Sequence, residues 1–198
     1  MRIALLLLVW MNTAFAAPFA VQVGEMRLAL DAPPGFSDTQ FTGSPRLVDI
    51  AESLTTASNR ILLFALEDED LRRFTLGDPI ELRRSVLIIT PRAMQQESLS
   101  LGAFRSFVAA SLPAGGANPP KVLRSDPEIT SVLLSARVAP ERPDGPARQV
   151  VSSRTLLLLR GKALDLTVFS RYDSAADLEW VRGATERWVE ELRRLNSR

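Results

Sequence analysis

The chain has 198 residues, with 24 lysines and arginines, 23 aspartates and glutamates, and neither cysteine nor histidine. These two absences exclude disulfides, Ser-His-Asp and Cys-His catalysis, and zinc sites with cysteine or histidine ligands. An enzyme with this composition would have to use carboxylates, as an acid pair of the glycosidase type or as ligands of an all-oxygen Mg²⁺ or Ca²⁺ site. We expect no cofactor, because the sequence has neither a Walker loop nor a dinucleotide-binding glycine motif.

The first residues are typical of a signal peptide. Met1-Arg2 is a basic start, Ile3–Trp10 is an unbroken apolar run, and Ala14-Phe15-Ala16 is a small-x-small cleavage site. The alternative, an uncleaved membrane anchor, would need about 20 apolar residues. We therefore predict a signal peptide at residues 1–16, a single domain at residues 17–198, and a periplasmic or secreted location.

Charge limits the partners that the predicted mature chain can have. Cleavage after Ala16 removes Arg2, which takes Lys+Arg from 24 to 23, equal to the 23 acidic residues. A neutral chain binds nucleic acid weakly, because affinity for phosphates depends on positive charge. We expect no nucleic-acid partner and, after cleavage, no membrane contact.

The first predicted elements are a hairpin, a helix and a buried strand. Residues 19–30 alternate apolar and polar side chains on both sides of Gly24-Glu25, which is suited to a turn. Ser44-Pro45 predicts the start of a helix, because serine is a preferred N-cap and proline suits the first helical position. Asn59 is a plausible stop for this helix. The continuous apolar run 61–66 predicts a buried strand.

The middle of the chain predicts a loop, a strand and a second helix. The acidic run Glu67–Asp70 is interpreted as a loop, followed by one helical turn at residues 71–74 and another loop. A strand is expected at residues 80–90. Ser98 or Ser100 then caps a helix with an apolar face.

Two more strands and a hairpin turn follow. Loops rich in proline and glycine, 113–120 and 140–146, flank a predicted strand at 129–138, and a long strand begins near Arg148. We place the next hairpin turn at Gly161-Lys162, with glycine at the first position of a type II′ turn. A phosphate-binding role for this stretch is the less favoured interpretation.

The register of this hairpin is predicted from its side chains. A turn at Gly161-Lys162 pairs Leu157 with Leu166 and gives one clean apolar face. A turn at Arg160-Gly161 would instead set Leu156 against Asp165, a worse match. A slip of one residue moves every side chain to the other face, so the pattern favours the first register.

The last predicted element is a long amphipathic helix. Ser174 is its N-cap, and Asp177 completes a variant of the capping box. An apolar stripe recurs at spacings of three and four: Leu178, Val181, Thr185, Trp188, Leu192 and Leu195. Hairpins with helices at intervals predict an α+β fold, a mostly antiparallel sheet covered by helices.

This order of elements resembles the PsbP-like α/β/α sandwich. The residues that carry the resemblance are Leu-Ala-Leu-Asp-Ala-Pro-Pro-Gly-Phe at 28–36, and residues 164–195, where a last strand leads into the long helix. PsbP-like proteins include exported bacterial proteins and photosystem-associated lumenal proteins. The resemblance implies a binding or assembly factor, and it carries over no catalytic residue.

Paired arginines are the candidate partner-binding residues. Arg72, Arg73, Arg83 and Arg84 lie close in sequence to the acidic run Glu67–Asp70. They either balance that run or bind an anionic partner, which would be a protein or a small anionic ligand. Calcium loops need alternating ligands and a turn glycine, so the adjacent acids favour a helix cap over a metal site. Metal binding by Glu67–Asp70 is kept as the alternative.

Three functions remain compatible with the sequence. A non-catalytic binding or assembly factor is favoured, and the composition does not decide whether any catalysis occurs. The alternatives are a small-molecule carrier with an apolar cleft near the loops 113–120 and 140–146, and a carboxylate-based hydrolase. The hydrolase would need two acids that converge in one cleft.

Overall fold

Two antiparallel meanders, joined edge to edge, form one seven-stranded sheet. The computed structural model describes residues 18–112, 119–138 and 148–197. The strand order is β3-β4-β5-β9-β8-β7-β6, and a separate two-stranded sheet contains β1 and β2. Strands β5 and β9 pair antiparallel and join the meander β3–β5 to the meander β6–β9. The predicted α+β class with a mostly antiparallel sheet is confirmed.

The strands are β1 (Phe19–Val23), β2 (Met26–Leu30), β3 (Phe36–Asp38), β4 (Asn59–Glu67), β5 (Arg84–Pro91), β6 (Lys121–Asp126), β7 (Ile129–Val138), β8 (Arg148–Leu159) and β9 (Lys162–Arg171). The α-helices are α1 (Pro45–Ser53), α2 (Asp68–Thr75), α3 (Leu101–Ser111) and α4 (Ala175–Leu195). Two short 3-10 helices lie at Thr39–Thr42 and Arg92–Met94. Within these described ranges, none of the helices has the length and hydropathy that a membrane span requires.

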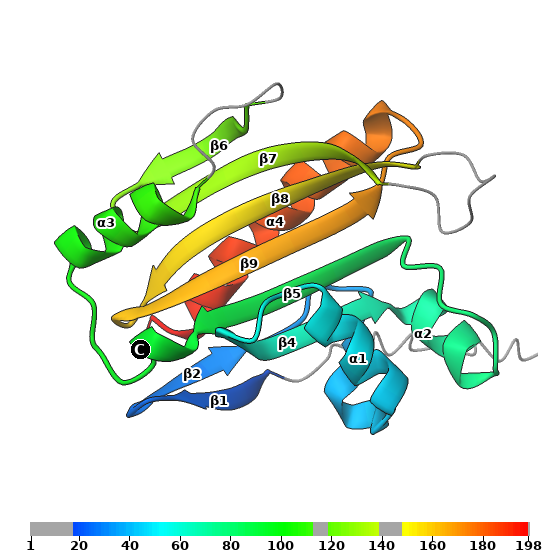
Figure 1. The fold of residues 1–198 in the computed structure, drawn as a ribbon, viewed down its shortest axis with the longest axis horizontal. Coiled ribbons are helices and arrows are strands. Elements are labelled where there is room, and N and C mark those ends of the chain that lie inside the picture. The colour runs from blue at the N-terminus through cyan, green and yellow to red at the C-terminus, as the bar shows by residue number, and fades with distance from the viewer. Residues whose placement is uncertain (1–17, 113–118, 139–147, 198) are drawn as a thin grey trace, which may run out of the picture.

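Helices cover both faces of the sheet (Figure 1). Helix α4 and the β1–β2 hairpin share one apolar core with one face of the sheet. On the other face, α1 and α2 pack against β4 and β5, and α3 packs against the turn end of β8 and β9. The sheet is therefore the middle layer of three.

Helix α4 forms as the sequence predicts. The Ser174 side chain accepts a hydrogen bond from the Ala176 amide at 3.2 Å, and the Asp177 carboxylate accepts one from the Ser174 amide at 3.0 Å. This is a complete capping box. Trp188 is 2% exposed and lies between α4 and the sheet, as predicted.

The predicted register of the β8–β9 hairpin is wrong. Leu157 pairs with Leu164 and Leu156 pairs with Asp165, so the turn lies at Arg160-Gly161. Both turn residues have positive φ, 51° and 78°. The predicted register requires one apolar face, whereas this hairpin is buried on both faces next to its turn.

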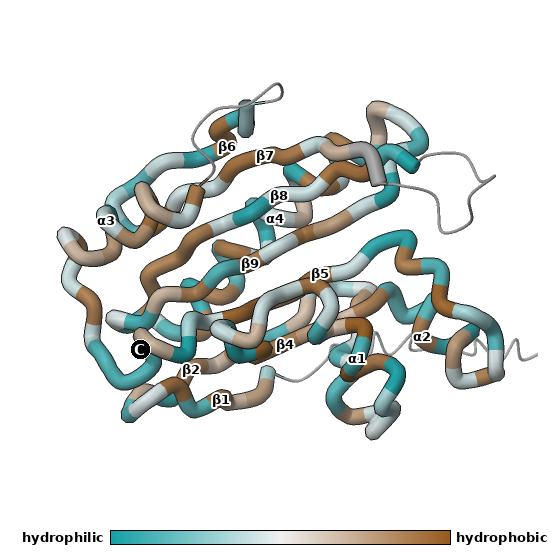
Figure 2. The backbone as a smooth tube through the Cα atoms, in the orientation of Figure 1, coloured by the Kyte–Doolittle hydropathy of each residue, from teal (hydrophilic) through white to brown (hydrophobic). Residues whose placement is uncertain are grey.

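The leucines of β8 explain why the alternation of apolar and polar side chains does not determine the register. Leu156 and Leu158 pack in the core under α3, and Leu157 and Leu159 pack in the core under α4. Figure 2 shows this apolar sequence close to the hairpin turn. Because either register buries leucines on both faces, the polar residues determine which register forms. The buried Lys162 ammonium donates to the carbonyl oxygens of residues 95 and 97, at 2.9 and 2.7 Å.

Several predicted boundaries also change. Strands β3 and β6 were not predicted, and β5 begins at Arg84 rather than at residue 80. The acidic run is not a loop: Asp68 is the first residue of α2, and Glu67 is its N-cap. The predicted loop at 140–146 lies outside the described residues, as do residues 113–118 of the other predicted loop.

Candidate functional site: a groove along helix α4

A groove runs along α4, between this helix and the segment Asp31–Ser37. Its volume is about 1050 Å³, at the upper end of the range for ligand pockets. The residues of α4 that line it are Trp180, Ala184, Arg187, Trp188, Glu191 and Arg194. They span about 20 Å of helix at 1.5 Å per residue, so the groove is elongated.

The second wall is the segment that leaves β2. Pro33 and Pro34 have no amide hydrogen, so the chain cannot continue as a paired strand there. Gly35 takes a positive φ of 84° and turns the chain, and the Phe36 amide donates to the Pro33 carbonyl at 3.1 Å. The Trp188 indole donates to the Asp31 carbonyl at 2.8 Å and fixes this wall to α4.

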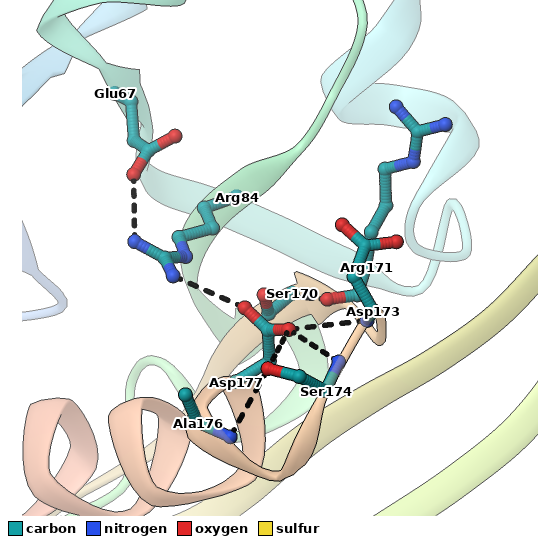
Figure 3. A network of polar contacts seen from close by, with 8 residues as sticks. All are labelled: Glu67, Arg84, Ser170, Arg171, Asp173, Ser174, Ala176 and Asp177. Carbon is teal, nitrogen blue, oxygen red and sulfur yellow. Dashed lines mark hydrogen bonds and ion pairs between the residues drawn. The ribbon is translucent and has the colours of Figure 1, made fainter.

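An aromatic–cation stack closes one end of the groove. The rings of Phe36 and Trp180 stack with centroids 5.9 Å apart, and the Arg84 guanidinium lies 4.2 Å from the Trp180 centroid. Figure 3 shows how Arg84 is held: its guanidinium contacts Glu67 at 3.2 Å and Asp177 at 3.1 Å. The stack therefore connects β3, β5 and α4, and the ion pair with Glu67 adds β4, so the groove has a rigid end.

The buried Ala184 forms part of the floor of the groove. This small residue lies about one helical turn from Trp180 on one side and from Trp188 on the other. Next to it, Gly183 allows a close approach, because an added Cβ would lie 2.9 Å from a guanidinium nitrogen of Arg187. The Arg187 side chain thus lies back over Gly183.

Carboxylates of the groove have different environments. Burial raises the pKa of the Asp31 carboxyl, a hydrogen bond from the Ala32 amide opposes this, and the charge of Glu191 adds to it. Hydrogen bonds from Arg194 lower the pKa of Glu191, at 2.8 and 2.5 Å. Asp31 forms no ion pair with any residue that the structure describes.

The four arginines predicted as a partner site do not share one environment. Arg84 belongs to the stack at the end of the groove. Arg73 contacts two exposed carboxylates of the α2–β5 connection, at 3.6 and 3.4 Å. Arg72 and Arg83 are exposed, and no ion pair to them is found within the described ranges. The sequence could not separate these roles, because neighbouring arginines differ only in the direction of their side chains.

The acidic run next to them has structural partners. Asp68 accepts a hydrogen bond from the Ser37 hydroxyl at 2.7 Å, and the buried Asp70 accepts one from the Arg83 amide at 3.3 Å. No group of three or more side chains that could hold a metal ion occurs in the part of the chain that the structure describes.

A smaller hollow of about 580 Å³ lies between α1 and the start of β4. Its two arginines already serve the fold. Arg60 donates to the Gln22 carbonyl at 2.9 Å, and Arg92 donates to the carbonyls of Ala57 and Asn59, both at 3.1 Å. The α4 groove is the better candidate site, because it is larger and one of its carboxylates, that of Asp31, is half-buried.

Sequence reasoning did not find this groove. The motif that forms one wall, Pro-Pro-Gly-Phe at 33–36, indicates the fold but not a binding site. Its contact with α4 joins residues 157 positions apart, Asp31 and Trp188. Two prolines and a glycine after a strand signal an irregular segment, but they do not indicate which helix it meets.

The chain matches no protein-family model and no curated protein. Among solved structures, the structure of this chain is similar to that of Mog1p, a Ran-binding protein from Saccharomyces cerevisiae. The sequence identity is 14%, the TM-score is 0.42, and the match covers 90% of this chain and 94% of that chain. The resemblance to PsbP-like proteins stays a prediction.

The predicted periplasmic or secreted location has to be corrected. The comparison with the yeast Ran-binding protein does not bear out this location. We therefore withdraw this location. Residues 1–16, predicted as a signal peptide, lie outside the described residues.

Proposed function

We propose that this protein is a non-catalytic binding or assembly factor that holds a segment of a protein partner in the α4 groove. The observation that carries the proposal is the shape of the groove, about 20 Å long with an apolar floor and charged walls. An extended chain advances about 3.3 Å per residue, so about six residues would fill this length. A small anion would occupy only a fraction of it.

The walls of the groove are held in place before any partner binds. One hydrogen bond fixes Asp31 to Trp188, and stacking fixes Phe36 to Trp180. A preformed site avoids the entropy cost of ordering its own side chains on binding. This favours recognition of a flexible segment, because only the partner has to become ordered.

The two other functions fit the groove less well. A hydrolase would use Asp31 and Glu191, whose pKa values are shifted in opposite directions, as in acid–base pairs. However, both oxygens of Glu191 accept hydrogen bonds from Arg194. A small-molecule carrier would enclose its ligand, whereas this site is an elongated groove. Native mass spectrometry of the purified protein would detect a bound small molecule.

Site-specific cross-linking tests the proposal. A photoreactive benzoylphenylalanine replaces Arg187, which lines the groove, and in a control it replaces Glu186, which is exposed on the same helix outside the groove. We expect irradiation in cells to give one discrete protein adduct from position 187 and none from position 186. The cross-linked segment, made as a peptide, should bind the purified wild-type protein. Equal adducts at both positions, or a peptide that does not bind, would reject the groove.

We also propose a secondary contact through the exposed arginines of the α2 region. The double substitution Arg72→Ala/Arg73→Ala should leave the melting temperature nearly unchanged, because exposed ion pairs contribute about 0–1 kcal/mol. It should weaken partner capture, and capture should fall as salt rises, since salt screens charges over about 8–10 Å. Arg105→Ala, on the exposed surface of α3, is the control. If the amount of captured partner changes neither with salt nor with the double substitution, recognition is confined to the groove.

A further inference from the structure

We infer that the segment bound in the α4 groove carries a basic side chain, which pairs with Asp31, and an apolar side chain, which lies over Ala184. This inference rests on the proposed function and names the chemistry of the partner. The apolar position follows from the floor of the groove, and the basic position follows from its charges.

Asp31 is a half-buried carboxylate that lacks a counterion. Its backbone carbonyl is held by the Trp188 indole, and its carboxylate accepts a hydrogen bond from the Ala32 amide. The backbone at Asp31 is therefore fixed to α4. Burial of a carboxylate without a cation is unfavourable, and an ammonium or guanidinium group from a ligand would remove this penalty.

The charged groups around Asp31 do not supply that cation. On α4, the Arg194 guanidinium is bound to Glu191 at 2.5 Å, and Arg187 lies over Gly183 and is exposed. Glu191 raises the pKa of Asp31 further through its charge. The place of a counterion at Asp31 is thus left for a ligand.

An acidic segment fits the same groove poorly. Three carboxylates line it, from Asp31, Asp68 and Glu191, against two arginines; Glu191 and Arg194 pair with each other, which leaves two carboxylates against one arginine. An acidic ligand would gain Arg187, which is exposed to solvent and so screened by salt. It would be repelled by the carboxylates. The balance of charge in the groove favours a cation.

The spacing of the two positions predicts a sequence pattern. Ala184 and Glu191, whose charge raises the pKa of the Asp31 carboxyl, are seven residues apart on α4, or about 10 Å along its axis. An extended segment covers this distance in about three residues. We therefore expect an apolar residue and a lysine or arginine three positions apart, in either chain direction.

Selection from a library of random displayed peptides tests this pattern with the full chain. Selected peptides should be enriched in the apolar-x-x-basic pattern. Asp31→Asn should weaken their binding about tenfold or more, the loss expected for one charge-assisted hydrogen bond. Asp49→Asn, which removes an exposed carboxylate from α1, should leave binding unchanged. Replacing the basic residue of the peptide by glutamine should weaken binding to the wild type but not to Asp31→Asn.

Stability separates a binding role of Asp31 from a structural role. Its pKa is raised from the ordinary 3.8 on folding, so the folded chain holds the proton more tightly than the unfolded chain does. Stability from this group therefore falls as the pH rises above 3.8. Asp31→Asn removes this penalty, so its melting temperature at neutral pH should equal or exceed that of the wild type. A clear decrease would indicate a structural role and overturn the inference.

The remaining outcomes distinguish the inference from the proposed function. Enrichment of acidic or purely apolar peptides that still cross-link to position 187 would overturn the inference and leave the groove as the binding site. Peptides that cross-link equally to positions 186 and 187 would reject the groove itself. A selection without any enriched pattern would count against both.

Discussion

Trp188→Ala is expected to lower the free energy of unfolding by about 3–5 kcal/mol, the range for a large aromatic side chain removed from a core. Trp188 is 2% exposed and packs between α4 and the sheet. The substitution also removes the donor to the Asp31 carbonyl, and an unsatisfied polar group adds to the cost. Urea denaturation followed by circular dichroism measures the loss.

Trp180→Ala is the matched control on the same helix. Trp180 is only partly buried, and its ring contacts Phe36 and Arg84 at the end of the groove. Its removal should cost clearly less than the removal of Trp188. Equal losses would show that the buried face of α4 is assigned incorrectly.

Arg154→Ala is expected to cost about 3–5 kcal/mol, because it leaves one partner of a buried ion pair without compensation. The Arg154 guanidinium donates to the Asp165 carboxylate at 2.6 Å, and the Asp165 side chain is 8% exposed. The same guanidinium donates to the Ser111 carbonyl at the end of α3, at 2.6 Å. Removing it leaves a buried charge and frees the end of this helix.

The double variant Arg154→Met/Asp165→Leu and the pH dependence test this explanation. Replacing both charges by apolar side chains should restore much of the stability. Burial already raises the pKa of Asp165 in the wild type, with Arg154 opposing the shift. Without Arg154 the folded chain takes up the proton more readily, so the deficit of Arg154→Ala should shrink as the pH falls. A deficit that is constant with pH would contradict this mechanism.

Local patterns explain which elements could be predicted from the sequence. The cap and stripe of α4 depend on residues three and four positions apart, and the β1–β2 turn depends on Gly24-Glu25, with Val23 paired to Met26. Each signal lies within one element. Tertiary contacts reinforce these preferences and do not oppose them.

Strands whose surroundings set their structure could not be predicted in the same way. Strand β6 is an edge strand with mostly exposed residues, including Val122 at 60%. It forms because β7 offers a partner, and its own side chains carry little periodicity. The β8–β9 register failed for the opposite reason: both faces are buried, and Asp165 is tolerated opposite Leu156 because Arg154 neutralises it.

The candidate site was even less accessible from the sequence. Arg83 and Arg84 are neighbours, yet Arg83 is exposed while Arg84 reaches Asp177 and Trp180. Successive side chains at a strand point to opposite sides, so only the fold decides which of the two is a surface charge. The importance of Asp31 likewise depends on a helix that lies far along the chain.

The pairing of β5 with β9 means that the seven-stranded sheet can be completed only when almost the whole chain has been synthesised. Both meanders contain contacts between neighbouring elements, which form quickly. Their union pairs Arg84 with Ser170 and Ile89 with Asp165, so it must wait until β9 has left the ribosome. Until then β5 is an open strand edge, ready to pair with another chain. A nascent chain stalled before β9 is therefore the species of this protein most exposed to aggregation.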